Sequence, residues 1–448
     1  MSQEDGTDHS NGMLQQSADM SPLLAPVEPE SAAREETIAL TYTGRWQDIA
    51  GLAITNSFLT ILTLGIYSFW GRTRIRKYLW SHTQVNSSPL EYHGTGGQLF
   101  IGFIIISLLF VGVNFGFQIL QNALIQAAIS TGSFEAALPI VIISSVVFAA
   151  LYVTFFAYII YSVRRYWLMM TSWRGIRLRQ GGKRRVMIGL AFGRAILTVA
   201  TLGFAYPWLA LRTERYAFSN SHVGNKQFSF SADVSPLVKG WLPVWLGYFV
   251  LIGLPIGVLS FAAGGWTDGA GTPGNPIQDL NNVLGANGNL ILFGYLTVAV
   301  LGITAAYAFF RARFFNVGVS GISLEGLQFH GNLRASSFLS AYVRAFLLTV
   351  VILIVPAAIL FLIAGVTAFA GDGGVGGIVA GLLVVLIYMA TSGFAWNVIV
   401  VHGLWKARVS ATTTTGTLNV MEIEQEHVER VKQGEGFGTA FDAGFGEA

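Results

Sequence analysis

The sequence predicts an α-helical multi-pass membrane protein, with three transmembrane hairpins (six long spans), two shorter candidate re-entrant helices and short cytoplasmic β-hairpins. Three observations lead to this fold class. The chain has 448 residues, of which 53% are hydrophobic and only 11% are charged, whereas soluble domains carry about 25% charged residues. Several apolar runs approach or exceed the roughly 20 residues that cross a bilayer. The Lys and Arg residues gather at one end of these runs.

Six apolar runs are long enough to span. In chain order they are Leu99–Gln118, Leu138–Val163, Trp241–Ala263, Leu290–Phe310, Ala345–Ala370 and Val375–Val401. The linkers 119–137, 264–289 and 371–374 contain no Lys or Arg, so they are expected to face outward, because short cytoplasmic loops hold the positive charges. Both termini are then expected to be cytoplasmic.

Two shorter apolar runs, Ile49–Tyr67 and Val186–Tyr206, have basic residues on both flanks. A complete crossing would place one basic flank outside, and Arg194 within the second run would lie in the membrane at a cost of several kcal/mol. One interpretation is therefore a pair of re-entrant helices that return to the cytoplasmic side. The alternative is eight ordinary spans that follow the charge rule imperfectly.

Internal repeats organise the membrane domain, which is expected over 38–410. A shift of 138 residues places TLGIYSFWGRTRIRKY (63–78) over TLGFAYPWLALRTERY (201–216), and a shift of 237 places LEYHG (90–94) over LQFHG (327–331). The repeats cover about 45–103, 185–241 and 305–340. The first shift aligns Thr63, Leu64, Gly65, Trp70, Arg74 and Tyr78 with Thr201, Leu202, Gly203, Trp208, Arg212 and Tyr216.

Five basic exits from the apolar runs each lead to a short stretch that alternates polar and apolar residues, which is typical of a β-hairpin. These hairpins are expected to form a small cytoplasmic sheet, because alternation requires that one face be covered. Its expected shared core is Tyr92, Leu178, Phe230, Phe329 and Val420. Segment 1–37 is expected to be a disordered acidic tail, and 411–448 a cytoplasmic strand followed by a disordered tail.

The basic exits are also candidate contacts for anionic lipids. The residues concerned are Arg72, Arg74, Arg76, Lys77, Arg212, Arg215, Arg311 and Arg313. A simpler interpretation is a cytoplasmic anchor, in which the cations lie at the headgroups and the aromatic neighbours lie in the interfacial belt.

Polar residues inside the apolar runs are the other candidates, because burying them costs free energy unless they find partners. They are Asn56, Asn114, Arg194, Arg344 and Asn397. Arg194 is aligned with Asn56 by the 138-residue shift, so that position is polar in both repeats. We expect Arg194 to face the protein interior, where it could either meet an anionic group or bond a helix carbonyl.

The pattern N-x-x-L-T-x-x-T-L-G-I-Y-x-x-W, which spans Asn56 to Trp70, is followed by R-x-R-x-x-Y at Arg74–Tyr78 and Y-x-G-T-G-x-x-L-x-x-G at Tyr92–Gly102. This combination resembles the YjgN-like family of bacterial inner-membrane proteins. The resemblance implies an inner-membrane location and brings no activity with it. The second repeat departs from the pattern, with Arg194 in place of Asn56 and Ala205-Tyr206-Pro207 in place of Tyr67-Ser68-Phe69.

Catalytic motifs are missing from the sequence. It has no cysteine, which excludes disulfides, thiolate catalysis and Cys metal sites, and no HExxH or Walker A pattern. GTGGQLFIG (94–102) enters an apolar run and is interpreted as a turn and helix start. The sequence thus predicts no enzyme, no cofactor, no metal and no nucleic-acid partner, with membrane lipids as the expected partners. Two functions remain open: a transporter or channel for a small solute, with an anion as the candidate, and a non-transporting envelope or anionic-lipid-associated scaffold.

Overall fold

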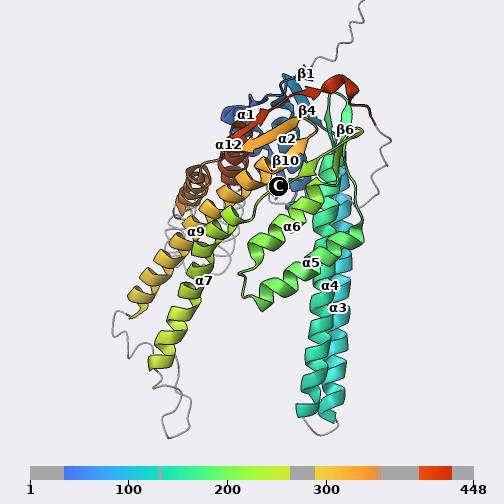
Figure 1. Ribbon diagram of the computed structural model, residues 1–448. Coiled ribbons are helices and arrows are strands. Elements are labelled where there is room, and N and C mark those ends of the chain that lie inside the picture. Colours follow the sequence, from blue (N-terminus) through green and yellow to red (C-terminus); the bar gives the residue numbers. More distant parts are fainter. Residues whose placement is uncertain are drawn as a thin grey trace, which may run out of the picture.

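The computed structural model describes residues 35–130, 134–262, 288–348, 350–351, 354 and 393–425. Two long helix pairs project from one side of a region of strands (Figure 1). The first pair is α3 (Gly96–Ser130) with α4 (Phe134–Met169), and the second is α7 (Ser235–Ala262) with α9 (Gly288–Ser320). A shorter helical hairpin lies between the two pairs in this view.

Two helical hairpins, α1 (Trp46–Leu62) with α2 (Ser68–Ser81) and α5 (Arg184–Ala200) with α6 (Tyr206–Phe218), begin and end at the strands. The strand before each hairpin pairs with the strand after it, so both ends of each hairpin lie at the same sheet. These strands are β2 (Leu40–Tyr42) with β3 (Thr83–Val85), and β6 (Ile176–Gln180) with β7 (Ser221–Val223).

The strands form a seven-stranded sheet in the order β2-β3-β4-β5-β6-β7-β8, a four-stranded sheet in the order β12-β11-β10-β9, and the pair β1-β13. All neighbouring strands are antiparallel. The remaining bounds are β1 (Glu35–Glu36), β4 (Ser88–Tyr92), β5 (Thr171–Trp173), β8 (Lys226–Gln227), β9 (Ser229–Phe230), β10 (Ile322–Leu324), β11 (Leu327–Gly331), β12 (Thr412–Thr415) and β13 (Leu418–Asn419).

The two larger sheets are continuous with each other. Only Phe228 separates β8 from β9, and at the opposite edges the Thr414 hydroxyl of β12 donates to the Ile38 carbonyl just before β2. The strands therefore surround one apolar core, and the β2 and β12 edges lie against each other. The buried members of this core are Ile38, Trp173, Val223, Leu324, Leu327, Leu418, Val420 and Ile423.

The glycine-rich segment before α3 is a helix start, in agreement with the interpretation of its sequence. Thr95 Oγ1 accepts from the Gln98 amide at 3.3 Å, and Gln98 Oε1 accepts from the Thr95 amide at 3.3 Å. This reciprocal pair is a capping box, which satisfies two backbone donors at the helix N-terminus. α3 then continues for 35 residues.

The prediction of six long spans is wrong. In the part of the chain that the structure describes, three helices are long and apolar enough to cross a membrane: Gly96–Ala127, Leu138–Met169 and Phe293–Ser320. The predicted runs Ala345–Ala370 and Val375–Val401 lie largely outside the described residues.

An apolar run marks burial, but burial in a protein core has the same signature as burial in lipid. Val400 and Val401, at the end of one predicted span, are buried against other helices in a short π-helix (Trp396–Val401). Trp241 and Val244, in another, are buried against Phe310 in a core near α6 and α9. By contrast, Val146 of α4 and Val298 of α9 are 64% and 72% exposed, as expected for helices that face lipid.

The predicted small sheet is also wrong in size, since the strands form a seven-stranded and a four-stranded sheet. Leu178, Phe329 and Val420 do lie in or against one core. Tyr92 instead packs with Trp80 and Tyr166 of α2 and α4, and Phe230 packs with residues of α6, α7 and α9. These two aromatic rings face the helices because both sheets are covered by helices on their second face. The alternation of polar and apolar residues in the strands did not reveal this second face.

Candidate functional site

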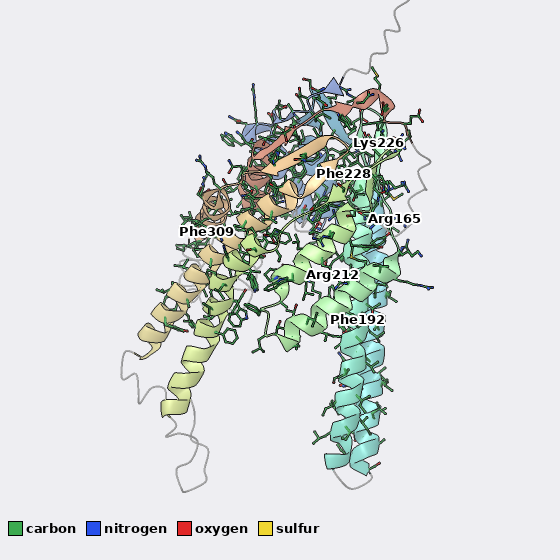
Figure 2. The ribbon with its side chains drawn as sticks, in the orientation of Figure 1. Arg165, Phe192, Arg212, Lys226, Phe228 and Phe309 are labelled. Atoms are coloured by element: carbon green, nitrogen blue, oxygen red, sulfur yellow. The ribbon has the colours of Figure 1, made fainter. Side chains whose placement is uncertain are left out.

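Five helices run almost directly into a β-hairpin: α2, α4, α6, α9 and α12 (His402–Ser410) precede β3, β5, β7, β10 and β12. Each carries Lys or Arg toward its strand-side end. Figure 2 places two of these residues, Arg165 and Arg212, between the strands and the far ends of the long helices. We call the set the cationic collar: Arg72, Arg74, Arg76, Lys77, Arg164, Arg165, Arg212, Arg215, Arg311, Arg313, Lys406 and Arg408.

The collar has little negative charge to balance it. α2, α6, α9 and α12 contain a single acidic residue, Glu214. Its Oε2 lies 3.0 Å from Arg164 Nη1, and the two side chains are 14% and 18% exposed. The Arg164 guanidinium also lies 4.3 Å from the centre of the Phe218 ring. With this pair neutral, the Lys and Arg residues of α2, α6, α9 and α12 outnumber the carboxylates of the same helices.

Most of the eight predicted lipid contacts lie at the surface. Arg74, Lys77, Arg212, Arg215 and Arg313 are exposed or partly exposed, while Arg72 and Arg311 are partly buried. Arg76 differs, because it is only 5% exposed and its guanidinium lies 4.7 Å from the centre of the Trp167 ring. It serves the packing of α2 against α4 and is not positioned for a lipid headgroup.

Asn56 joins the two helices of the first hairpin. Its Nδ2 donates to the Gly71 carbonyl at 3.1 Å, and its Oδ1 accepts from Arg74 Nη1 at 3.4 Å. Arg74 Nη1 also donates to the Tyr67 hydroxyl at 3.1 Å. The polar group that the sequence marked in this run is therefore satisfied within the protein.

The other polar candidates behave in different ways. Asn114 of α3 accepts from the Tyr152 hydroxyl of α4 at 2.5 Å and donates to its own helix at the Phe110 carbonyl. Asn397 donates to the Gly393 carbonyl at 2.7 Å. Arg344 is exposed in the apolar helix Ala335–Leu348. Among the described residues, none of these three is hydrogen-bonded to Asn56 or to another of the three.

Arg194 lies on α5, and its guanidinium is 4.8 Å from the centre of the Tyr206 ring on α6. Tyr206 in turn stacks on Trp241 of α7, with ring centres 4.7 Å apart. Arg194 thus faces the neighbouring helices, and its contact within the described chain is an aromatic face, with no carboxylate opposite it.

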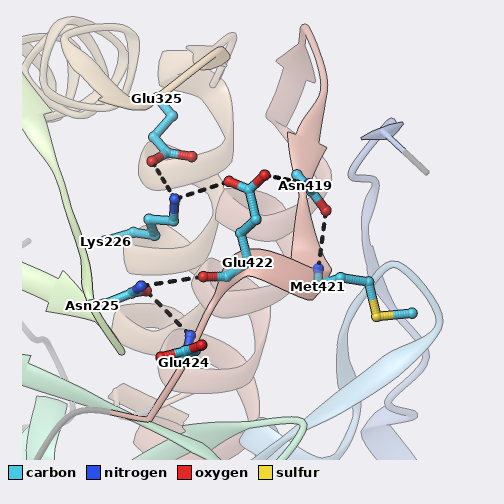
Figure 3. A network of polar contacts seen from close by, with 7 residues as sticks. All are labelled: Asn225, Lys226, Glu325, Asn419, Met421, Glu422 and Glu424. Atoms are coloured by element: carbon cyan, nitrogen blue, oxygen red, sulfur yellow. Dashed lines mark hydrogen bonds and ion pairs between the residues drawn. The ribbon is translucent and has the colours of Figure 1, made fainter. Parts of the chain in front are cut away.

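Sequence reasoning missed a polar network on the strands, which Figure 3 shows. Lys226 Nζ lies 2.7 Å from a Glu325 oxygen and 3.3 Å from a Glu422 oxygen. Asn225 Nδ2 donates to the Glu422 carbonyl at 3.2 Å, and the Asn225 amide donates to the Glu424 carbonyl at 3.0 Å. The network fixes the segment after β13 across the β7–β8 turn. Its members come from three distant segments, so no local motif announces it.

One cluster resembles a catalytic arrangement in composition only. His93 Nε2 lies 2.7 Å from Ser172 Oγ and 3.5 Å from a Glu91 oxygen. A Ser-His-acid relay requires the acid on the other ring nitrogen and an accessible serine, but here both partners share Nε2 and Ser172 is 1% exposed. Over the described ranges, no three His, Asp or Glu residues are grouped to hold a metal.

A family model described as "Bacterial protein of unknown function (DUF898)" matches residues 37–440. The chain belongs to this family. The relatives that it matches include the inner membrane protein YjgN of Salmonella typhimurium, at 32% identity over 72 residues, and that of Escherichia coli K12, at 38% identity over 50 residues. The YjgN-like relationship predicted from the sequence is confirmed, and the relatives place this DUF898 protein in an uncharacterised family of inner-membrane proteins.

The matches to the two relatives are short. They cover 16% of this chain and 18% of the Salmonella protein, and 11% of this chain and 13% of the Escherichia coli protein. The chain therefore spans less than a fifth of either relative. No solved structure matches it.

Proposed function

We propose that this DUF898 protein is a non-enzymatic, non-transporting scaffold of the inner membrane, which uses the cationic collar to bind anionic lipid headgroups. The single observation that supports this is the charge imbalance of the collar, whose α2, α6, α9 and α12 segments hold one acidic residue and adjoin apolar helices. Cations near an anionic leaflet are worth about 1 kcal/mol each, so several acting together favour such lipids strongly.

Transport of a small anion is the second candidate. Asn56, Asn114 and Asn397 support it poorly, because each is bonded within the protein. Arg194 is the observation in its favour, since a guanidinium against an aromatic face keeps donors for an anion.

The collar also implies an orientation. Gln84 lies on β3 and Gly224 lies in the β7–β8 turn of the same seven-stranded sheet. Because the adjoining helix ends are rich in Lys and Arg, this side is proposed to be cytoplasmic.

The native chain has no cysteine, so single cysteines can test this orientation in spheroplasts with a membrane-impermeant maleimide. Gly224 has a positive φ and no room for a side chain beside the Glu424 carbonyl, so Gln227 of the same hairpin takes its place. Gln84→Cys and Gln227→Cys should remain unlabelled, whereas Ser130→Cys, at the far end of α3, should react. Labelling of either strand position would overturn the proposed orientation.

The lipid proposal is tested by neutralising three collar cations together, Lys77→Gln, Arg215→Gln and Arg313→Gln. The matched control removes three cations from the β5–β6 hairpin, at Arg174, Arg177 and Arg179, so that the net charge changes equally. Purified proteins are mixed with nanodiscs that contain phosphatidylglycerol or only phosphatidylcholine, and co-purified lipid is quantified by mass spectrometry.

We expect the wild type and the control to enrich phosphatidylglycerol and the collar variant to lose most of that enrichment. A collar variant that retains the wild-type lipid ratio would overturn the proposal. Uptake of a radiolabelled anion by sealed proteoliposomes made from the same purified protein, compared with empty liposomes, tests the second candidate.

A further inference from the structure

The two helical hairpins have the same backbone turn at a spacing of 138 residues. Leu64 and Gly65 have φ values of 50° and 95°, and Leu202 and Gly203 have 50° and 89°. The Gly65 amide donates to the Thr60 carbonyl at 2.7 Å, and the Gly203 amide donates to the Thr198 carbonyl at 2.6 Å. The tips of the hairpins are therefore built alike.

The opposite ends of the hairpins also match. The Tyr78 hydroxyl accepts from the Arg45 amide at 2.8 Å and donates to the Arg45 carbonyl at 3.2 Å. The Tyr216 hydroxyl makes the same two bonds with Lys183, at 2.7 and 3.0 Å. With both ends in the same register, position 194 corresponds to Asn56 and position 212 corresponds to Arg74.

In the first hairpin, the only cation at these two corresponding positions is Arg74, and its partners are neutral. Arg74 contacts the Asn56 oxygen at 3.4 Å and the Tyr67 hydroxyl at 3.1 Å. In the second hairpin, Arg194 replaces Asn56 and Ala205 replaces Tyr67. Both acceptors are therefore lost, and the alignment puts a second cation, Arg194, at the position that in the first hairpin contacts the remaining one.

No acidic residue of the second hairpin compensates the two cations. The only carboxylate on α5 and α6 is that of Glu214, which is paired with Arg164. Arg194 is partly buried and stacks on Tyr206, while Arg212 is exposed. Stacking on a ring uses the face of a guanidinium and leaves its N–H edges free for an anion.

We infer that Arg194 and Arg212 together bind a phosphate-class anion in the second hairpin, with the Tyr206 ring supporting the Arg194 guanidinium. Two guanidinium groups present the planar donors that phosphate oxygens accept. The anion is either a lipid headgroup or free phosphate. The first source rests on the proposed lipid-binding function, whereas the second is independent of it.

The first hairpin supplies the test variant. Arg194→Asn gives the second hairpin the Asn–Arg pair of the first, so the fold has a precedent within the same chain. Arg212→Gln removes the other cation and leaves the Tyr206 contact in place. Arg177→Gln, on β6 and outside the collar, is the charge-matched control. Isothermal titration of the protein in a neutral detergent measures binding of inorganic phosphate, the free anion. Nanodiscs with phosphatidylglycerol at trace level are used to measure binding of the lipid headgroup.

We expect Arg194→Asn and Arg212→Gln to weaken saturable binding at least about tenfold, the effect of losing one charge-assisted contact of about 1.4 kcal/mol, while Arg177→Gln binds as the wild type does. Binding of phosphate in detergent identifies a soluble anion, and binding only in nanodiscs identifies a headgroup. The inference is overturned if the wild type binds neither ligand, or if either variant keeps wild-type affinity. The variant that neutralises Lys77, Arg215 and Arg313 tests lipid binding by the collar separately. Failure of one proposal can therefore be distinguished from failure of the other.

Discussion

Glu214→Gln removes the carboxylate that α6 contributes to the collar and leaves Arg164 without its ionic partner. At the observed separation of 3.0 Å, the Coulomb attraction is roughly 5–6 kcal/mol for an effective dielectric constant of about 20. Arg164 keeps the Phe218 ring and is 18% exposed, so rehydration recovers part of this. We expect a net loss of about 2–3 kcal/mol, near the lower bound for breaking a buried pair.

The assay is thermal unfolding of the purified protein in detergent, followed by tryptophan fluorescence at a fixed heating rate. The expected fall in the apparent midpoint is roughly 3–6 °C, because large proteins shift by the fewest degrees per kcal/mol. Glu91→Gln is the control: Glu91 faces His93 with its side chain 59% exposed, and such surface pairs contribute about 0–1 kcal/mol. Arg164→Met with Glu214→Met should be less destabilised than the sum of the single changes. An unchanged midpoint for Glu214→Gln, or strict additivity, would refute the reasoning.

Three further predictions can be checked in the same thermal assay. Burial lowers the pKa of His402 below its ordinary value. The neutral imidazole should therefore contribute its full stability above about pH 6.5, and this contribution should be lost as the pH falls through the lowered pKa. His402→Gln should remove this part of the pH dependence of the unfolding midpoint. Gly65→Ala should destabilise by about 1–2 kcal/mol, because φ is positive there, whereas Gly51→Ala in open space on α1 should be neutral or slightly stabilising in the same thermal assay. Tyr152→Phe should cost about 0.6 kcal/mol through loss of the bond to Asn114, and the exposed Tyr248→Phe should cost nothing measurable.

The parts of the fold that sequence reasoning predicted are those with a local pattern. The 138-residue alignment paired Thr63-Leu64-Gly65 with Thr201-Leu202-Gly203 without predicting a turn inside either apolar run. The structure gives both segments the same turn, in which glycine adopts a positive φ and the threonine hydroxyl accepts a hydrogen bond from the amide four residues on. The capping box of α3 has a local pattern of the same kind. The number of spans has no local pattern, because an apolar run can be buried either in lipid or in a protein core. Val400 and Val401, for example, lie in a protein core.

The same distinction between local and long-range patterns applies to the residues of the candidate site. Exposed cations such as Lys77 and Arg313 could be predicted from their position after an apolar run. The burial of Arg76 against Trp167 depends on α4 packing against α2, so Arg76 looked identical to its neighbours in the sequence. The Lys226 network combines Glu325 and Glu422, which lie about a hundred and two hundred residues farther along the chain, and only the completed strands bring them together.

The two hairpins form an internal comparison in which structure is held constant and chemistry varies. The residues that are identical in both, such as Gly65 with Gly203 and Tyr78 with Tyr216, make the same backbone bonds in both, so their identity is explained by folding. The substitution of Asn56 by Arg194 has no such explanation, because the first hairpin shows that the turn and both ends form with a neutral residue there. A second guanidinium at this position adds electrostatic repulsion that the fold does not require. The contact with the Tyr206 ring offsets part of that cost, and the proposed anion between Arg194 and Arg212 would offset more of it, which is why Arg194 is the cation on which we base the inferred ligand site.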